Sequence, residues 1–416
     1  MENKQVLYPG NTIGIIGLGS GTQKLAQAAQ NAGFRVGAYI HSEAERDLAK
    51  FVDYTVIGAW NDRDKLKEFG QSCDAVVYES ANVQSIVIDY LAQFTAVPQG
   101  KEILEITQDR LLERAFFDQI NVNIAPYVTV TQLDDVYQSI DAIGYPAVLN
   151  PIQKGLGERS MVIERQSDIV KAADYLDAGT YVLESWIPRT REFSLMVAKN
   201  TDTIKLFPLV ENSYRDGKVI EAKAPAILAD DVLEEIGRIG TAVAQNLNYQ
   251  GVFEIGFYLT ETNTLYVKGV TPALVRQGDV LTAVTATDQY AMLLRAVAGL
   301  PLPDIAVLQP AIMMTINKAQ IDEIKTQWLL KENWQFNFYT ATLQKKLHSY
   351  GYVIAIGDTL DKLQLQIDNT DVWTDRDHPE QEENWLIKKV LQSITQVKHL
   401  FVRLKDFSVF GKKSRI

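Results

Sequence analysis

A glycine-rich loop near the amino terminus has residue types and spacing that suit phosphate binding. It runs from Gly17 through Gly19 to Thr22, between an apolar, β-branched segment and a segment with helical spacing. A tight glycine turn at the start of a helix directs backbone N–H groups at an anion. A dinucleotide site would need a third glycine where Thr22 stands and an acid where His41 stands. The loop is therefore interpreted as a strand-to-helix turn able to bind a phosphate ester, and an NAD-dependent oxidoreductase is disfavoured.

The elements around this loop indicate a doubly wound domain. Apolar strands alternate with helical stretches, and such strand–helix–strand repeats imply parallel βαβ units. The first helix is expected to end at Gly33, which suits a C-cap. The predicted strands lie within the segments 12–20, 34–40, 53–59 and 74–78.

The segments that follow predict a mixed region of helices and strands. A single amphipathic helix is expected over 106–119. The other predicted elements are a strand–helix–strand unit (127–150), two strands (181–187 and 192–199), a helix (231–248), a hairpin (251–270) turning at 261–263, a helix (286–299), a region of strands with one helix (305–372) and a final helix (380–405).

Composition limits the class of protein. The 416 residues suffice for two to four domains, and 46% apolar with 22% charged residues is typical of a globular chain. No apolar run is long enough for stable membrane insertion, no secretory signal is recognised, and the single cysteine, Cys73, forms no internal disulfide. A cytoplasmic location is therefore expected. The net charge of −11 argues against a nucleic-acid partner.

Several motifs, taken in order, resemble one enzyme family. They are similar to motifs of the ATPase subunit of phosphoribosylaminoimidazole carboxylase, the biotin-independent carboxyaminoimidazole ribonucleotide synthetase of the ATP-grasp superfamily. The resemblance covers roughly residues 12–360 and rests on YESANV (78–83), QDRLLERAF (108–116), FPLVENSYRDG (207–217) and LRAVAGLPL (294–302).

This resemblance implies an α/β and α+β fold in four parts. These are a doubly wound pre-ATP-grasp domain (1–105), an ATP-grasp domain (106–304), a small β-rich C-terminal domain (305–375) and an additional helix with a basic tail (376–416). It also implies a homodimer that binds a nucleotide or ribonucleotide. In the family, ATP activates bicarbonate as carboxyphosphate, and the carboxyl group passes to the amine of aminoimidazole ribonucleotide, a step of purine biosynthesis.

Several residues match the family's binding sites. Arg110 matches a basic nucleotide contact, although a surface helix arginine would look the same. Glu192 matches an acid that accepts the ribose hydroxyls, although any strand can carry a solvated glutamate. In the lid, Gly155 and Arg159 match by position. The adenine hinge corresponds to Glu184, Ser185, Trp186 and Ile187, and the substrate site to Gly17, Gly19, Glu79 and Asn82.

The family's phosphate and metal positions carry different residues here. Asn150 replaces a lysine that pairs with ATP phosphates, and Lys154 lies nearby but outside the family's position. The two magnesium carboxylates fall on Gly256 and Gly269, and Lys268 replaces an asparagine beside the second. An ammonium has no lone pair for a metal. Magnesium is therefore not expected, and the hypothesis is that Lys268 itself offsets phosphate charge.

Two further residues bear on this site. Glu254 precedes Gly256 by two residues and points to the same face, roughly 7 Å along the strand, so it could bind a metal only after a register shift. A histidine that contacts phosphate in the family aligns with Tyr214.

Two classes of function remain open. One is a divergent carboxyaminoimidazole ribonucleotide synthetase, or a related ATP-dependent carboxylate–amine ligase, as the ordered motifs suggest. The other is a non-catalytic homologue that binds a nucleotide or ribonucleotide as a scaffold or regulator. Losing one group that stabilises transition-state charge commonly lowers turnover ~100–1000-fold. The sequence therefore favours ATP binding with weakened or lost catalysis, and it assigns no catalytic residue.

The C-terminal segment 380–405 has an apolar stripe typical of a helix that packs on the body or on a second subunit. The stripe consists of Trp385, Val390, Ile394, Val397 and Phe401.

Overall fold

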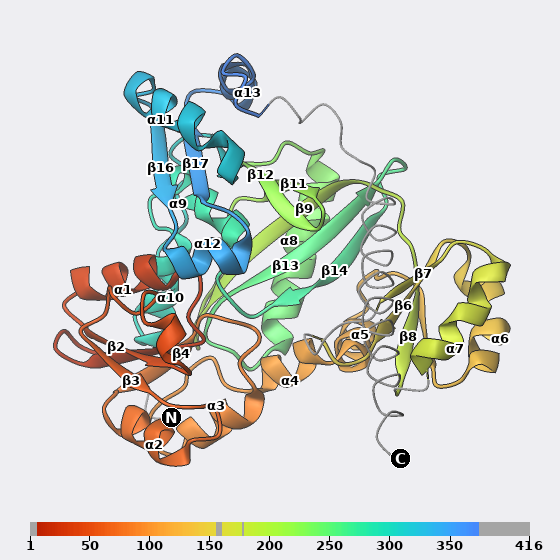
Figure 1. The fold of residues 1–416 in the computed structure, drawn as a ribbon, viewed down its shortest axis with the longest axis horizontal. Coiled ribbons are helices and arrows are strands. Elements are labelled where there is room, and N and C mark those ends of the chain that lie inside the picture. The colour runs from red at the N-terminus through yellow and green to blue at the C-terminus, as the bar shows by residue number, and fades with distance from the viewer. Residues whose placement is uncertain (1–5, 155–159, 177–178, 374–416) are drawn as a thin grey trace, which may run out of the picture.

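The computed structural model describes residues 6–154, 160–176 and 179–373, and Figure 1 shows their arrangement. The amino-terminal domain is a four-stranded parallel sheet in the order β3-β2-β1-β4. All four predicted strands are confirmed. So is the first helix, which ends just before Gly33, a residue in the left-handed region (φ 84°). The elements are β1 (Thr12–Ile16), α1 (Thr22–Asn31), β2 (Arg35–Ile40), β3 (Tyr54–Ile57), α2 (Arg63–Gln71), β4 (Ala75–Tyr78) and α3 (Ser85–Leu91).

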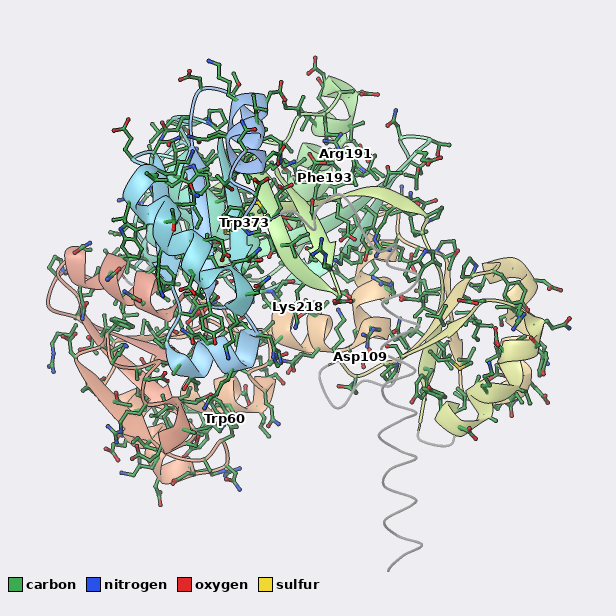
Figure 2. The ribbon with its side chains drawn as sticks, turned by 45° about the horizontal axis from the view of Figure 1, so that its top comes forward. Trp60, Asp109, Arg191, Phe193, Lys218 and Trp373 are labelled. Atoms are coloured by element: carbon green, nitrogen blue, oxygen red, sulfur yellow. The ribbon has the colours of Figure 1, made fainter. Side chains whose placement is uncertain are left out.

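The prediction of one helix over 106–119 is wrong, because two helices meet at Asp109. They are α4 (Glu102–Gln108) and α5 (Arg110–Gln119). Asp109 has extended backbone angles (φ −114°, ψ 118°), and its carboxylate accepts the N–H groups of Leu111 and Leu112. An N-cap of this kind satisfies the free donors of a new helix. Asp109 therefore ends α4 and starts α5 at the position that Figure 2 labels.

A second sheet, at the right in Figure 1, has four antiparallel strands in the order β5-β8-β6-β7. One helix, α6, ends at Gly144, which has a positive φ of 85°. The elements are β5 (Tyr127–Val130), α6 (Leu133–Ile143), β6 (Ala147–Pro151), β7 (Met161–Ile163), α7 (Ala173–Leu176) and β8 (Tyr181–Ser185).

The central sheet has nine strands, eight of them in the order β14-β13-β9-β11-β12-β15-β17-β16, while β10 pairs with β9. The predicted hairpin is confirmed: its strands turn at 261–264, where Asn263 adopts a positive φ of 58°. The elements up to residue 297 are β9 (Arg189–Lys199), β10 (Ile204–Leu206), β11 (Val210–Arg215), β12 (Lys218–Ala224), α8 (Asp230–Asn246), β13 (Gly251–Thr260), β14 (Leu265–Thr271), α9 (Leu281–Val284) and α10 (Gln289–Val297).

The C-terminal region extends this central sheet. Its strands β15, β17 and β16 follow β12 in the sheet order. The prediction of one helix in this region is wrong, because three α-helices are present in its described part, two of which start at threonine N-caps, Thr340 and Thr359. The elements are β15 (Ala311–Ile316), α11 (Ile321–Leu330), β16 (Trp334–Phe338), α12 (Ala341–Leu347), β17 (Gly351–Ile356) and α13 (Leu360–Asp368). The predicted helix over 380–405 and the basic tail lie outside the described residues.

The faces of the central sheet differ in polarity. On β9, Phe193 (Figure 2), Leu195 and Val197 are buried in an apolar cluster that also contains residues of α8. The alternate residues Glu192 and Ser194 face the other side, as the two-residue period of a strand requires. In the described part of the chain, no helix is long and apolar enough to cross a membrane.

Candidate nucleotide site

The polar face of the central sheet carries a bonded set of buried side chains. Glu192 and Ser194 on β9, Asn212 on β11 and Glu254 on β13 are all buried. Ser194 Oγ donates to Glu254 Oε1 (2.6 Å) and accepts a hydrogen bond from Asn212 Nδ2 (2.9 Å). Because buried polar groups need partners, these bonds fix the side chains on this face.

Glu192 holds two cations at the open end of this face. Arg189 Nε donates to Glu192 Oε1 (2.5 Å), and Lys268 Nζ donates to Oε2 (3.0 Å). The Arg189 guanidinium lies 4.6 Å from the ring centre of Tyr258. The Lys268 ammonium lies 4.8 Å from the ring centre of Tyr214 and 5.2 Å from that of Tyr258, distances at which aromatic faces attract cations. We call the surface formed by Arg189, Glu192, Tyr214, Tyr258 and Lys268 the sheet-face site.

The charge state of this site follows from its contacts. Desolvation disfavours the Lys268 ammonium, but Tyr258, Tyr214 and Glu192 outweigh this effect and raise the pKa of Lys268 above its ordinary value. Burial raises the pKa of the Tyr214 phenol. At neutral pH the site therefore presents a protonated lysine beside an uncharged phenol.

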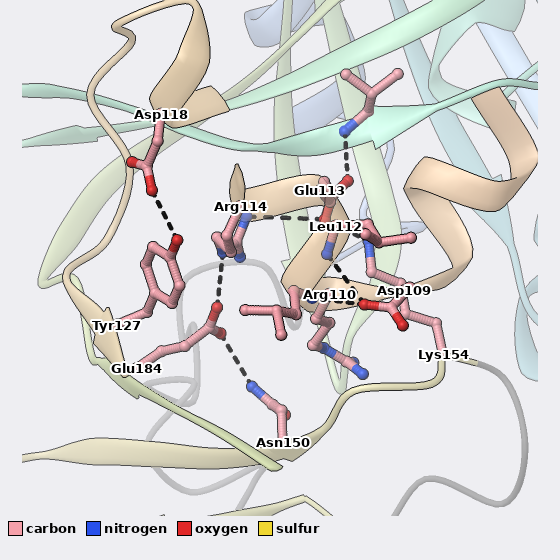
Figure 3. Close-up of polar contacts among 12 residues, drawn as sticks. Asp109, Arg110, Leu112, Glu113, Arg114, Asp118, Tyr127, Asn150, Lys154 and Glu184 are labelled. Atoms are coloured by element: carbon pink, nitrogen blue, oxygen red, sulfur yellow. Dashed lines mark hydrogen bonds and ion pairs between the residues drawn. The ribbon is translucent and has the colours of Figure 1, made fainter. Parts of the chain in front are cut away.

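The predicted adenine hinge lies at the end of β8, where the Glu184 side chain is already bonded (Figure 3). Its Oε1 accepts Arg114 Nε (2.7 Å), and its Oε2 accepts Asn150 Nδ2 (3.1 Å). Burial disfavours the charge on Arg114, but Glu184 and Glu113 outweigh this effect and raise the pKa of Arg114. Asn150, which replaces the family's lysine, is thus a partner of a carboxylate.

The other predicted hinge residues follow Glu184 directly. Ser185 ends β8, and the Trp186 N–H donates to the Pro146 carbonyl (3.0 Å). The Ile187 carbonyl accepts the Arg189 N–H (2.8 Å), which places the hinge next to the sheet-face site.

Arg110 opens α5 at the edge of the second sheet. Its Nη1 donates to the Pro151 carbonyl (2.7 Å), and its own N–H donates to the Ile152 carbonyl (2.8 Å). In this structure Arg110 therefore joins α5 to the end of β6, and its predicted contact with a nucleotide remains a prediction.

Two paired glycines occupy the positions where the resemblance implies metal-binding carboxylates. Gly256 on β13 pairs directly with Gly269 on β14. A Cβ atom at Gly256 would lie 3.2 Å from Lys268 Cδ, and one at Gly269 would lie 3.0 Å from Glu113 Oε1. Both contacts are closer than ordinary packing allows. Lys268 and Glu113 therefore fill the space into which metal-binding side chains would project.

The neighbouring carboxylates are held by other groups. Glu254 Oε1 accepts hydrogen bonds from Ser194 and from Gln277 Nε2 (3.2 Å). Glu113 Oε2 accepts Lys154 Nζ (2.6 Å), and Figure 3 labels both residues. Within 6–154, 160–176 and 179–373, no three His, Cys, Asp or Glu residues form a metal-binding group. Because magnesium needs several oxygen ligands in octahedral geometry, these residues do not fit it.

The glycine loop of the amino-terminal domain is closed by a carboxylate. Glu79, which is buried, accepts the N–H groups of Gly19 (3.1 Å) and Gly21 (2.6 Å) and the hydroxyl of Thr22. A Cβ atom at Gly19 would lie 2.9 Å from Glu79 Oε1, so glycine is required for this approach. Gly17 adopts a positive φ of 70°, which glycine tolerates best.

The remaining predicted site residues are placed as follows. Asn82 is exposed on the turn after β4, where its N–H donates to Ser80 Oγ (3.2 Å). Gly155 and Arg159 lie outside the described residues.

The site residues that were not predicted from the sequence include Glu113, Arg114, Arg189 and Tyr258. Glu113 and Arg114 are two adjacent charged residues within an amphipathic helix, and both are buried. Consecutive charges that fall partly on the apolar face of a helix are the signal that could have revealed them.

Comparison with known proteins places this geometry in a family. Residues 10–108 match the ribonucleotide synthetase preATP-grasp domain, and residues 115–288 match the ATP-grasp domain.

The chain is similar to N5-carboxyaminoimidazole ribonucleotide synthases along most of its length. It is 27% identical over 377 residues to an N5-carboxyaminoimidazole ribonucleotide synthase of Bacillus subtilis, covering 90% of this chain and 98% of the relative. A crystal structure of the Staphylococcus aureus synthetase complexed with ADP superposes with a TM-score of 0.81 at 24% identity, covering 88% of this chain and 99% of that one. The Thermus thermophilus synthetase gives a TM-score of 0.77 at 25% identity, with coverages of 86% and 97%. The chain therefore contains a ribonucleotide synthetase preATP-grasp domain followed by an ATP-grasp domain, and along most of its length it is similar to N5-carboxyaminoimidazole ribonucleotide synthases.

Proposed function

We propose that this chain binds an adenine nucleotide at the hinge and the sheet-face site and has weakened or lost the ligase chemistry of its relatives. The observation that carries this proposal is the Gly256–Gly269 pair. The family relation supports nucleotide binding, and a homologous synthetase has been solved with ADP. The missing carboxylates argue against metal-assisted phosphoryl transfer.

The retained groups suit nucleotide binding better than turnover. Glu192 has oxygen lone pairs left for ribose hydroxyls beyond its bonds to Arg189 and Lys268. The hinge at Trp186 and Ile187 adjoins this carboxylate; because the Trp186 N–H and the Ile187 carbonyl are already bonded within the chain, an adenine would bind the Trp186 carbonyl and the Ile187 N–H. Phosphoryl transfer, by contrast, depends on cations that neutralise developing charge on three oxygens. A single lysine replaces only part of such an arrangement.

A divergent ligase is the alternative function. The relatives are N5-carboxyaminoimidazole ribonucleotide synthases, and the matched preATP-grasp domain favours a ribonucleotide substrate in the purine pathway. The closed glycine loop argues against a phosphate at Gly19 and Gly21, because Glu79 already occupies these amides.

The experiment that separates these functions measures binding and turnover on the same preparation. Calorimetry with ADP and with ATP should detect binding. Phosphate release with ATP, bicarbonate and aminoimidazole ribonucleotide should fall at least ~100-fold below that of the Bacillus subtilis relative, assayed in parallel. Turnover at the relative's rate would overturn the loss of catalysis, and absence of ADP and ATP binding would overturn the nucleotide site.

We also propose that the chain forms a homodimer through α11 and β16. Trp328 and Leu329 on α11 are 54% and 87% exposed, and Trp328 stacks on Phe338 of the edge strand β16. Among the described residues β16 is an edge strand of the central sheet, and an exposed apolar surface beside such an edge favours association. A second copy would bring an identical edge and an identical apolar surface.

Light scattering of Leu329→Glu tests this dimer. The variant should show the mass of one chain where the unaltered protein shows two. Leu365→Glu on α13, where Leu365 is 62% exposed, is the matched control and should leave the mass unchanged. Equal masses for Leu329→Glu and the unaltered protein would rule this surface out.

A further inference from the structure

Lys268 occupies an unusual position in the central sheet. The β13–β14 register changes between Gly256, which pairs with Gly269, and Phe257, which pairs with Val267. Lys268 is therefore the extra residue of a β-bulge, a feature that redirects a side chain. Its Cβ and Cδ lie 3.3 and 3.2 Å from the point where a Cβ of Gly256 would stand. The lysine stem thus fills the space that a side chain at position 256 would take.

The side chain that carries this ammonium is held at its end and partly exposed. Lys268 Nζ donates to Glu192 Oε2 (3.0 Å), and its side chain is 41% exposed. An ammonium has three N–H donors, and among the residues described here Glu192 is its one hydrogen-bond acceptor. Donors thus remain for a ligand.

The neighbours of Lys268 keep this ammonium in place. Glu192 is held from its other oxygen by Arg189 (2.5 Å), so the carboxylate does not depend on Lys268 for its charge partner. Tyr214 and Tyr258 flank the ammonium with their rings. A cation fixed in this way loses little conformational freedom when an anion binds.

We propose that Lys268 is the phosphate-binding cation of this site, and that it allows the chain to bind a nucleoside diphosphate or triphosphate without a divalent metal. This inference rests on the proposed nucleotide site and specifies how that site recognises its ligand. The lysine suits the glycine at position 256, because a Cβ atom there would lie 3.2 Å from Lys268 Cδ and the Lys268 stem would have to move to accommodate a larger side chain. A hydrogen bond between an ammonium and a phosphate is charge-assisted and stronger than a neutral one.

The test compares ADP with adenosine, which lacks the phosphates, in the presence of EDTA and in the presence of magnesium. In the unaltered protein, ADP should bind more tightly than adenosine, and EDTA should leave the ADP affinity unchanged. Lys268→Met should weaken ADP binding about 10- to 100-fold and leave adenosine binding unchanged, because only the phosphate contact is lost. Lys268→Arg should retain most of the ADP affinity.

Lys362→Met on α13 is the matched control, since Lys362 is exposed and pairs only with Asp358 among the described residues. It should bind both ligands as the unaltered protein does. If Lys268→Met does not fold, Lys268→Gln replaces it and carries the same expectation.

The outcomes separate this inference from the proposed function. Dependence of ADP binding on magnesium, or equal loss of ADP and adenosine affinity in Lys268→Met, would overturn the role of Lys268 while the nucleotide site stands. Absence of binding for both ligands in the unaltered protein would overturn the proposed function itself.

Discussion

The glycine loop and the sheet-face site both contain hydrogen-bond donors that suit an anion. They differ in how many of these donors are already bonded to a carboxylate of the chain. In the loop, buried Glu79 accepts both backbone N–H groups and the Thr22 hydroxyl. In the sheet-face site, Glu192 binds Arg189 and Lys268, yet Lys268 stays 41% exposed. A site can bind an anionic ligand only if some of its hydrogen-bond donors are not already taken by acceptors of the chain itself.

This difference also bears on the glycines of each region. Gly19 lacks a side chain because the Glu79 carboxylate lies within 2.9 Å of its missing Cβ. Gly256 lacks one because the Lys268 stem passes 3.2 Å from the corresponding point. A glycine-rich loop is usually taken as a sign of a bound phosphate. Here glycine makes room for the chain's own charged side chain in both regions.

The largest expected effect comes from opening the closed loop with Glu79→Ala. The variant leaves the Gly21 N–H and the Thr22 hydroxyl without their acceptor, while the Gly19 N–H keeps only the Thr22 oxygen; this should lower the free energy of unfolding by about 1–3 kcal/mol. Inorganic phosphate should restore part of this loss, because it binds the freed amides of the folded state. Thermal unfolding with and without phosphate measures both effects.

Asp74→Ala is the control for this experiment. Asp74 accepts a single backbone N–H, that of Thr12 (2.7 Å), so its loss should destabilise the domain without creating a phosphate site. If phosphate stabilises neither variant, the loop geometry does not suit a free anion. The glycine loop could then not be compared with the sheet-face site as an anion site.

A smaller effect should follow from Glu192→Gln, which removes the carboxylate from the sheet-face site. The loss of one negative charge beside Lys268 should raise the affinity for pyrophosphate about 3- to 10-fold at low salt. Adenosine affinity should fall, because the ribose loses its carboxylate acceptor. Competition binding at two salt concentrations measures both ligands.

Glu211→Gln is the matched control, since Glu211 pairs with Arg191 on the same sheet (2.7 Å) outside the sheet-face site. It should change neither affinity. If pyrophosphate binds Glu192→Gln no better than the unaltered protein, Glu192 does not compete with ligands for Lys268.

Local patterns were sufficient to predict much of the fold, and the hairpin and its turn follow from neighbouring residues. The glycines at positions 256 and 269 were noticed only through the family resemblance, and their direct pairing across the two strands was not predicted. The bonds of Glu184 were not predicted, because its partner Arg114 lies 70 residues away and the pair forms only when α5 packs against β8. The helix break at Asp109 was missed because amphipathic periodicity continues across it, although an aspartate can cap a helix.

The smallest expected effect is the pH dependence of the Glu79 contribution. Burial raises the pKa of Glu79, and the bonds from Thr22, Gly19 and Gly21 only partly offset this effect. Because the folded state then retains the proton to a higher pH than the unfolded state, the stability contributed by Glu79 is present at low pH and is lost as the pH rises through the folded-state pKa. Glu79→Gln cannot titrate, so the stability difference between the unaltered protein and this variant should decline with rising pH, by less than about 1.4 kcal/mol per unit. Denaturant unfolding across the acidic range measures this slope. A slope of the opposite sign would mean that the loop amides stabilise the Glu79 carboxylate more than burial disfavours it. Glu79 would then be negatively charged in the folded state, as a bound phosphate would be.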